Sequence, residues 1–210
     1  MIEELFLPTN LNTDSILEEL LSMGATSIRL LEENFRVALL EEAEDYDYQP
    51  EVEIVGSGDS VARQQVSSFD VFTDHSGYVL LKESFQDLLE QRMAQLEAYP
   101  LETSLDFNSM VLQRYEEGSL GITSHRDGLS YVNLVCAFII GGRGRFYVCS
   151  DRSGRDAKEI DASPGNVIFM RAPGLFEAED NRPFHYVSQI EEPRYTFGLR
   201  QKKEPQDNPY

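Results

Sequence analysis

The sequence predicts an α+β fold in which amino-terminal helices support a β sandwich or barrel. Apolar residues recur at helical spacing in the first half of the chain, whereas short β-rich runs separated by Gly, Pro and Asp turns fill the second half. The 210 residues suit one domain with an extension. A hydrophobic content of 41% and a charged content of 26% are ordinary for a folded protein and argue against disorder of the whole chain.

Three helices are expected before residue 100. The first is capped by Thr13 or Asp14 and closed by Gly24, and the second covers roughly residues 29–44. The third covers roughly residues 81–98 and ends before Pro100. It has the clearest apolar stripe, formed by Phe85, Leu88, Leu89, Met93 and Leu96.

Strands are expected in two regions. Residues 51–80 combine short extended runs with a loop and a turn at 74–77. Further runs occupy residues 110–115, 132–140, 145–149, 166–170, 185–190 and 194–201. The expected organisation is an acidic helical extension over 1–106 that includes a lid-like β segment at about 51–80, a β core over 107–201, and a flexible tail over 202–210.

Charge and cysteine usage exclude several classes of function. The net charge is −19, and residues 1–54 alone hold 14 acidic and 2 basic side chains. Such a chain is repelled by phosphate backbones and anionic membranes unless it has a local basic patch. Two cysteines, Cys136 and Cys149, provide neither a disulfide framework nor a CxxC zinc motif. No signal peptide or long apolar run is visible, so a cytoplasmic protein without a membrane partner is expected.

The histidines supply the candidate metal ligands. His125 and Asp127 lie two residues apart and share a face if the segment is extended. His185 follows 58 residues after Asp127, at the start of a later β run. Two imidazoles and one carboxylate on one face of a β core form the facial triad that binds non-haem Fe(II) and leaves open positions for a co-substrate and O₂.

Two arginines follow the last histidine. In the run RYTFGLR, Arg194, Thr196 and Arg200 share one face of a strand, and a guanidinium is a suitable partner for the far carboxylate of 2-oxoglutarate. An isolated HxD pattern is common and carries little information. The order HxD, then His, then RxxxxxR within a β-rich half is far more specific and favours function over chance.

Residues 107–201 resemble the catalytic core of AlkB-like Fe(II)/2-oxoglutarate dioxygenases. The resemblance rests on FNSMVLQRYEEGSLGITSHRDG, GGRGRFYV, GNVIFMRAP, RPFHYVSQI and PRYTFGLRQ. It implies a double-stranded β-helix, or jelly roll, with Fe(II) held by His125, Asp127 and His185. Arg194 would bind the distal carboxylate of 2-oxoglutarate and Arg200 would lie nearer the metal. By the same resemblance, Gln113, Tyr115 and Thr196 would be contacts of the co-substrate, Gln113 replacing the family's usual Asn.

The resemblance implies hydroxylation of a substrate C–H with O₂, as in oxidative N-demethylation of an alkylated nucleobase or nucleotide, free or in single-stranded nucleic acid. A weaker likeness places the family's substrate lid at RQQVSSFDVFTDHSGY, residues 63–78, with His75 in an exposed turn. Leu129 stands where repair members commonly have an acidic residue. That departure and the charge favour the alternative of a small molecule or protein side chain. The one basic segment, 143–158, is either a substrate contact or a solvated hairpin tip. A non-catalytic jelly-roll binding module is the remaining rival.

Overall fold

A computed structural model describes residues 2–176, 180 and 182–203 of the chain. Its helices are α1 (Ile2–Leu5), α2 (Thr13–Met23), α3 (Glu33–Glu44) and α4 (Gly77–Met93). Its strands are β1 (Ala25–Arg29), β2 (Gln49–Pro50), β3 (Ile54–Val55), β4 (Ala62–Arg63), β5 (Ser67–Phe69), β6 (Ser109–Tyr115), β7 (Ile122–His125), β8 (Tyr131–Cys149), β9 (Lys158–Ile160), β10 (Asn166–Arg171) and β11 (Phe184–Lys202). The α+β prediction is confirmed.

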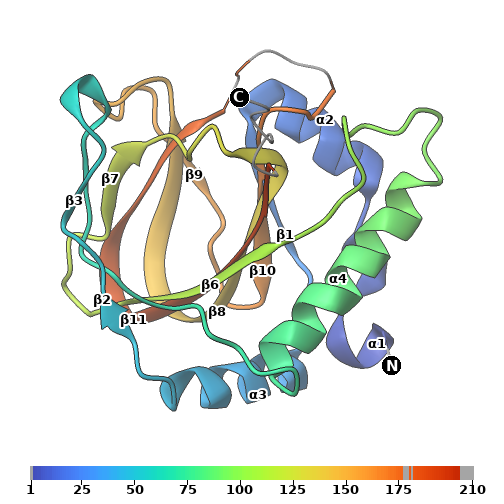
Figure 1. The fold of residues 1–210 in the computed structure, drawn as a ribbon, viewed down its shortest axis with the longest axis horizontal. Coiled ribbons are helices and arrows are strands. Elements are labelled where there is room, and N and C mark those ends of the chain that lie inside the picture. Colours follow the sequence, from blue (N-terminus) through green and yellow to red (C-terminus); the bar gives the residue numbers. More distant parts are fainter. Residues whose placement is uncertain (1, 177–179, 181, 204–210) are drawn as a thin grey trace, which may run out of the picture.

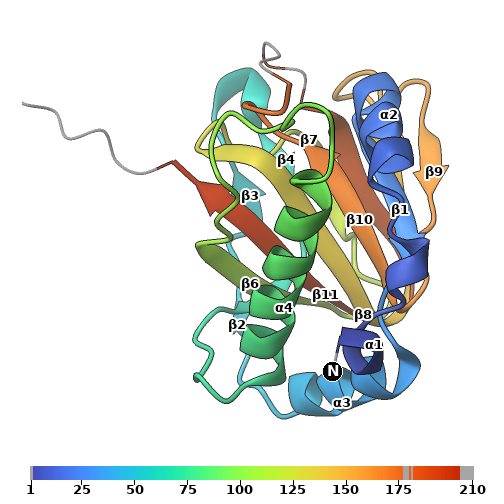
Figure 2. The same cartoon turned by 90° about the vertical axis from the view of Figure 1, so that its right-hand side faces the viewer.

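Antiparallel pairing joins almost all strands into one curled sheet (Figures 1 and 2). The path runs β1-β10-β8-β11-β6-β5-β2, with β7 on β11 and β9 on β8, while β3 and β4 form a separate hairpin. β8 and β11 each extend over 19 residues and pair with each other along most of that length. These two strands lie in the middle of the sheet and join β1 and β10 on one side to β6, β5 and β2 on the other.

Alternation along β8 separates two apolar clusters. Cys136, Phe138 and Ile140 belong to the larger cluster under the helices, whereas Val135 and Ile139 belong to a smaller cluster inside the curled sheet. Burial therefore fixes the register of β8, because a slip by one residue would exchange the two sets.

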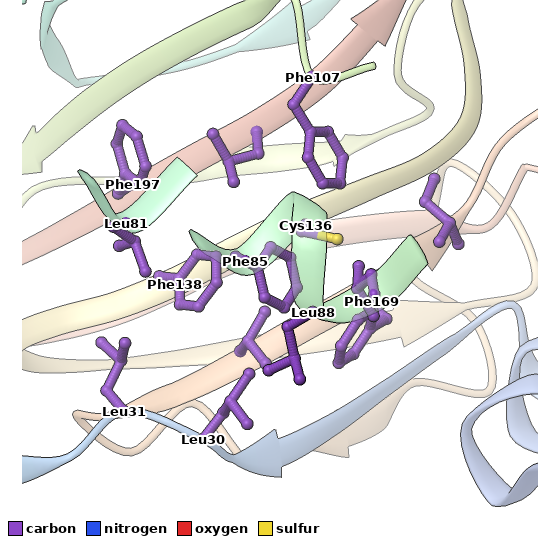
Figure 3. Packing of buried hydrophobic residues seen from close by; sticks show 14 of the residues in the cluster. Leu30, Leu31, Leu81, Phe85, Leu88, Phe107, Cys136, Phe138, Phe169 and Phe197 are labelled. Carbon is purple, nitrogen blue, oxygen red and sulfur yellow. The ribbon is translucent and has the colours of Figure 1, made fainter. Parts of the chain in front are cut away.

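α4 covers the larger cluster. In Figure 3, Leu81, Phe85 and Leu88 of α4 point at Phe138 and Phe169 of the sheet, and the rings of Phe85 and Phe138 meet edge-on at 4.8 Å. α3 contacts both α4 and β8, and α2 packs on β1 and β10. The helices thus cover one side of the sheet and leave its interior for the site.

Several predicted bounds are wrong. The helix expected over 29–44 begins only at Glu33, because Ala25–Arg29 pairs with β10 as strand β1. The third helix begins at Gly77, where the Ser76 hydroxyl caps it, and ends at Met93. The cap of α2 is Asn12 rather than Thr13 or Asp14.

Two of the breaks expected between β-rich runs, at GGRG after residue 140 and at residues 191–193, lie inside long strands. GGRG is part of β8, which bends there because Gly142 adopts a φ of +77° and a side chain on it would collide with the Pro193 carbonyl. β11 likewise joins the runs expected at 185–190 and 194–201, with register shifts between them.

The division at residue 106 stays a prediction, although β1 of the amino-terminal part pairs with β10 of the core. Of the tail predicted over 202–210, residues 204–210 lie outside the described part of the chain.

Candidate metal and co-substrate site

The three candidate metal ligands meet at one point. His125 ends β7 and His185 lies near the start of β11, and the two are direct partners across the antiparallel pair. Their ring centroids lie 4.3 Å apart. Asp127 follows His125 by two residues, and the possible ligand atoms of the three side chains all lie within 4.8 Å of one another. This spacing suits a single small cation.

Backbone carbonyls fix both imidazoles. His125 Nδ1 lies 2.9 Å from the Thr123 carbonyl oxygen, and His185 Nδ1 lies 3.2 Å from that of Pro183. A carbonyl only accepts, so each Nδ1 carries the proton and each Nε2 keeps its lone pair for a metal. Sequence reasoning did not identify these acceptors, although each lies two residues before its histidine.

The protonation states of His125 and Asp127 are also those that metal ligands need. Burial and the neighbouring His185 lower the pKa of His125 to about 4, so this imidazole is neutral at pH 7. Burial alone would raise the pKa of Asp127, but its neighbours His185 and Arg200 hold it below its ordinary value. The site therefore offers a neutral imidazole and a carboxylate, the forms that bind metal.

A cavity of about 400 Å³ opens at the triad inside the curled sheet. All eight residues selected from the sequence line it: Gln113, Tyr115, His125, Asp127, His185, Arg194, Thr196 and Arg200. The lining also includes Val135, Phe146 and Met170, which give it an apolar wall. Its size and mixed lining are typical of a small-molecule site.

Arg194 is a buried cation without a described counter-ion. Its side chain is 1% exposed, and its guanidinium carbon lies 5.5 Å from the centre of the Tyr115 ring. Burial lowers its pKa, and no carboxylate of the described residues lies within salt-bridge distance. Its Nε and the Thr196 Oγ1 are buried without a hydrogen-bond partner. Because such groups are costly unless satisfied, this end of the cavity fits an anionic ligand.

The other candidate contacts lie around this ligand space. Arg200 Nε is also buried without a partner, and its guanidinium carbon lies 5.3 Å from the centre of the Tyr131 ring. The Tyr115 hydroxyl faces Gln113 Oε1 at 3.5 Å, which is at the limit of a hydrogen bond. The His-Asp-His cluster thus fits a ferrous ion, and the unpartnered guanidinium groups fit the carboxylates of an oxo-acid.

The β3–β4 hairpin forms one wall of the cavity. Val55 and Gln64 line the cavity, while the Arg63 amide donates to Thr123 Oγ1 at 2.9 Å and the Gln65 amide donates to the Gly121 carbonyl at 2.8 Å. These bonds attach the part of the lid-like segment nearest the site to the strand that carries His125. His75 is exposed and does not line the cavity.

Arg182 is a site residue that the sequence did not reveal. Its guanidinium donates to the backbone carbonyl of Asp127 and forms a bidentate pair with Asp180, with both N···O distances at 2.6 Å. It therefore ties the loop of one metal ligand to the segment that precedes His185. The only signal in the sequence is its position three residues before that histidine.

Replacement of Arg182 by Ala is expected to weaken metal binding roughly 10- to 100-fold, the usual range for residues that orient metal ligands. Titration of Mn(II), followed by its EPR signal, measures this. Arg155→Ala is the control because Arg155 also pairs with aspartates, Asp151 and Asp156, but has no bond to the Asp127 carbonyl. Equal Mn(II) affinity in all three proteins would contradict the role of Arg182.

The basic segment 143–158 is largely neutralised. Arg143 pairs with Glu191 and Glu192, and Arg145 pairs with Glu159. Arg155 lies against Asp151 and Asp156. These ion pairs neutralise three of the segment's five basic side chains, all but Arg152 and Lys158, which favours the hairpin-tip interpretation of this segment.

No protein-family model matches the sequence, and no curated protein matches it either. Solved structures do match. A Trichoplax adhaerens prolyl hydroxylase, solved with a peptide fragment of the hypoxia inducible factor oxygen degradation domain, aligns with a TM-score of 0.66 and 13% identity over 90% of this chain and 88% of that one. A Pseudomonas putida prolyl-4-hydroxylase gives a TM-score of 0.63 and 11% identity over 90% and 98%.

A third match is an oxidoreductase of the 2OG-Fe(II) oxygenase family from Burkholderia pseudomallei, with a TM-score of 0.57, 13% identity and 91% of both chains covered. The chain has the fold of these oxygenases. The jelly-roll prediction is thereby confirmed, whereas nothing in these matches singles out the AlkB-like branch. None of the described helices is long and apolar enough to span a membrane.

Proposed function

We propose that this protein is an Fe(II)/2-oxoglutarate-dependent oxygenase that hydroxylates a substrate C–H. The observation that supports it best is the cavity in which a His-Asp-His cluster and an unpaired buried arginine face the same space. A metal alone would explain the cluster but leave Arg194 without an anion. A carboxylate ligand alone would leave the two prepared imidazoles unused.

Each residue then has a definite task. His125, Asp127 and His185 hold Fe(II), and the bound iron with 2-oxoglutarate and O₂ supplies the oxidising power, producing succinate and CO₂. Arg194 binds the distal carboxylate, and Thr196 and Tyr115 donate hydroxyls beside it. Arg200 adds positive charge near Asp127. Val135, Phe146 and Met170 form the apolar wall of the cavity and exclude water along it.

For the substrate, we favour a peptide side chain or a small molecule. Two of the similar structures are prolyl hydroxylases, and one of them holds a peptide. The neutralised 143–158 segment and the net charge of −19 disfavour a phosphate backbone. Leu129, 60% exposed beside the cavity-lining Gly128 and Ser130, presents an apolar contact instead of an acidic base reader.

AlkB-like N-demethylation of an alkylated nucleobase or nucleotide is the second candidate. It is supported by the motifs of residues 107–201 and by the lid-like hairpin that forms part of the cavity wall. Its product would be the demethylated base and formaldehyde. A free nucleotide meets less electrostatic repulsion than a long strand, so it is the more favourable form of this substrate.

The test measures succinate formed from 2-oxoglutarate with Fe(II) and O₂. Wild type should produce succinate well above Asp127→Ala, and a true substrate should raise the rate further. If wild type and Asp127→Ala both form succinate only at background level, the protein is a non-catalytic binding module and the proposed function is wrong. The increase in succinate formation on adding proline-containing peptides is then compared with the increase on adding methylated single-stranded DNA, at several salt concentrations. Stimulation by methylated DNA with a steep salt dependence would select demethylation over the favoured substrate class.

A further inference from the structure

A glycine of β8 lies against the stem of the buried Arg194. Gly144 of β8 is buried, does not line the cavity, and lies against the stem of Arg194. A Cβ placed on Gly144 would stand 3.0 Å from Arg194 Cδ and 2.7 Å from Ile190 Cδ1. Carbon atoms in contact normally keep about 3.5–4.0 Å, so a methyl group there would force a displacement.

Two side chains meet this added methyl group, Ile190 at its Cδ1 end and Arg194 along its stem. Ile190 is 4% exposed and packed in the inner cluster, so it has little space to yield. Arg194 lines the cavity while Gly144 does not, and the methyl group would therefore push the arginine stem toward the empty space. The guanidinium would then bind a carboxylate nearer to the metal cluster.

We infer that Gly144 is a specificity-determining residue that sets the depth of the co-substrate subsite, and hence the chain length of the oxo-acid that reaches from the metal to Arg194. This inference rests on the proposed function. Gly144 acts through Arg194 and touches no ligand, so it is a positioning residue rather than a catalytic one.

The chain offers a matched control on the same strand. A Cβ on Gly141 would meet Leu40 Cδ1 at 2.7 Å, a contact as tight as that at Gly144, but Leu40 belongs to α3 and lies outside the cavity. Neither glycine has a positive φ, so alanine brings no backbone strain at either position. The two substitutions differ in whether the added methyl group meets Arg194.

The experiment measures binding rather than turnover. 2-Oxoglutarate and oxaloacetate, which is one methylene shorter, are titrated calorimetrically into protein loaded with Mn(II) under nitrogen. Gly144→Ala is expected to bind 2-oxoglutarate about tenfold or more weakly, since one misplaced methylene is worth roughly 10- to 200-fold in a fitted pocket. Oxaloacetate should lose much less, so the preference shifts toward the shorter acid. Gly141→Ala should keep the wild-type preference.

A double variant keeps the inference testable if Gly144→Ala alone folds poorly. Ile190→Val removes the Cδ1 atom that a methyl group on Gly144 would strike, so Gly144→Ala with Ile190→Val should fold and still show the shift. If this double variant binds both acids with the wild-type ratio, Gly144 does not set the depth and the inference is wrong. If wild type itself shows no Mn(II)-dependent binding of 2-oxoglutarate, the proposed function fails and the inference fails with it.

Discussion

Asp127→Ala should abolish tight metal binding and reduce 2-oxoglutarate-dependent succinate formation to background. Asp127 is the only carboxylate in the described lining of the cavity, and its pKa is held low beside two histidines and Arg200. Without it, the two imidazoles, which carry no negative charge, leave a bound dication without charge compensation in a cavity that Arg194 and Arg200 also line. The expected loss exceeds 100-fold, above the roughly 10- to 100-fold seen for residues that only support a ligand.

Mn(II) titration and succinate formation measure the two effects separately. Asp87→Ala is the control, because Asp87 is exposed on helix α4 and lies outside the cavity. If Asp127→Ala binds Mn(II) with the same affinity as wild type and Asp87→Ala, the assignment of the metal ligand is wrong.

Arg194→Met should greatly weaken the binding of 2-oxoglutarate and leave the affinity for Mn(II) nearly unchanged. Methionine keeps much of the apolar stem but loses the fork that binds a carboxylate. Loss of this charge-assisted contact is worth roughly 2–4 kcal/mol, or about 30- to 1,000-fold in the dissociation constant.

The same variant should have the opposite effect on the free protein. Arg194 is almost fully buried with no described carboxylate partner, so its charge destabilises the fold in the absence of a ligand. The melting temperature without 2-oxoglutarate should therefore equal or exceed that of wild type, while the increase on adding the acid should disappear. A lower melting temperature with unchanged 2-oxoglutarate affinity would show that Arg194 is structural.

The sequence was informative where function imposes fixed local spacing. Thr196 and Arg200, two and six residues after Arg194, face the same cavity because alternation in an extended chain is local, whereas Asp127 reaches it from the loop just after β7. Strong local signals also revealed α2 and the stripe of α4, although not their first residues.

Contacts between distant segments could not be predicted in the same way. β1 is a strand because β10, far along the chain, pairs with it, while its own five residues carry only a weak β pattern. GGRG suggested a turn because glycine is permissive, yet here it allows β8 to pass close to Pro193 and Arg194. The carbonyls that orient the imidazoles belong to the backbone, which is the same at every residue, so no residue type marks them.

One consequence follows from the length of β11. His185, Arg194, Thr196 and Arg200 lie on this single strand, which β8 borders along most of its course and β6 and β7 border on the other side. A central strand of this kind opens only when the sheet around it comes apart, so fraying at the periphery of the fold does not reach these four residues, whereas His125 and Asp127 lie at the end of the short strand β7 and just beyond it. We therefore expect substitutions that stabilise this sheet to keep these four residues in place to a higher temperature.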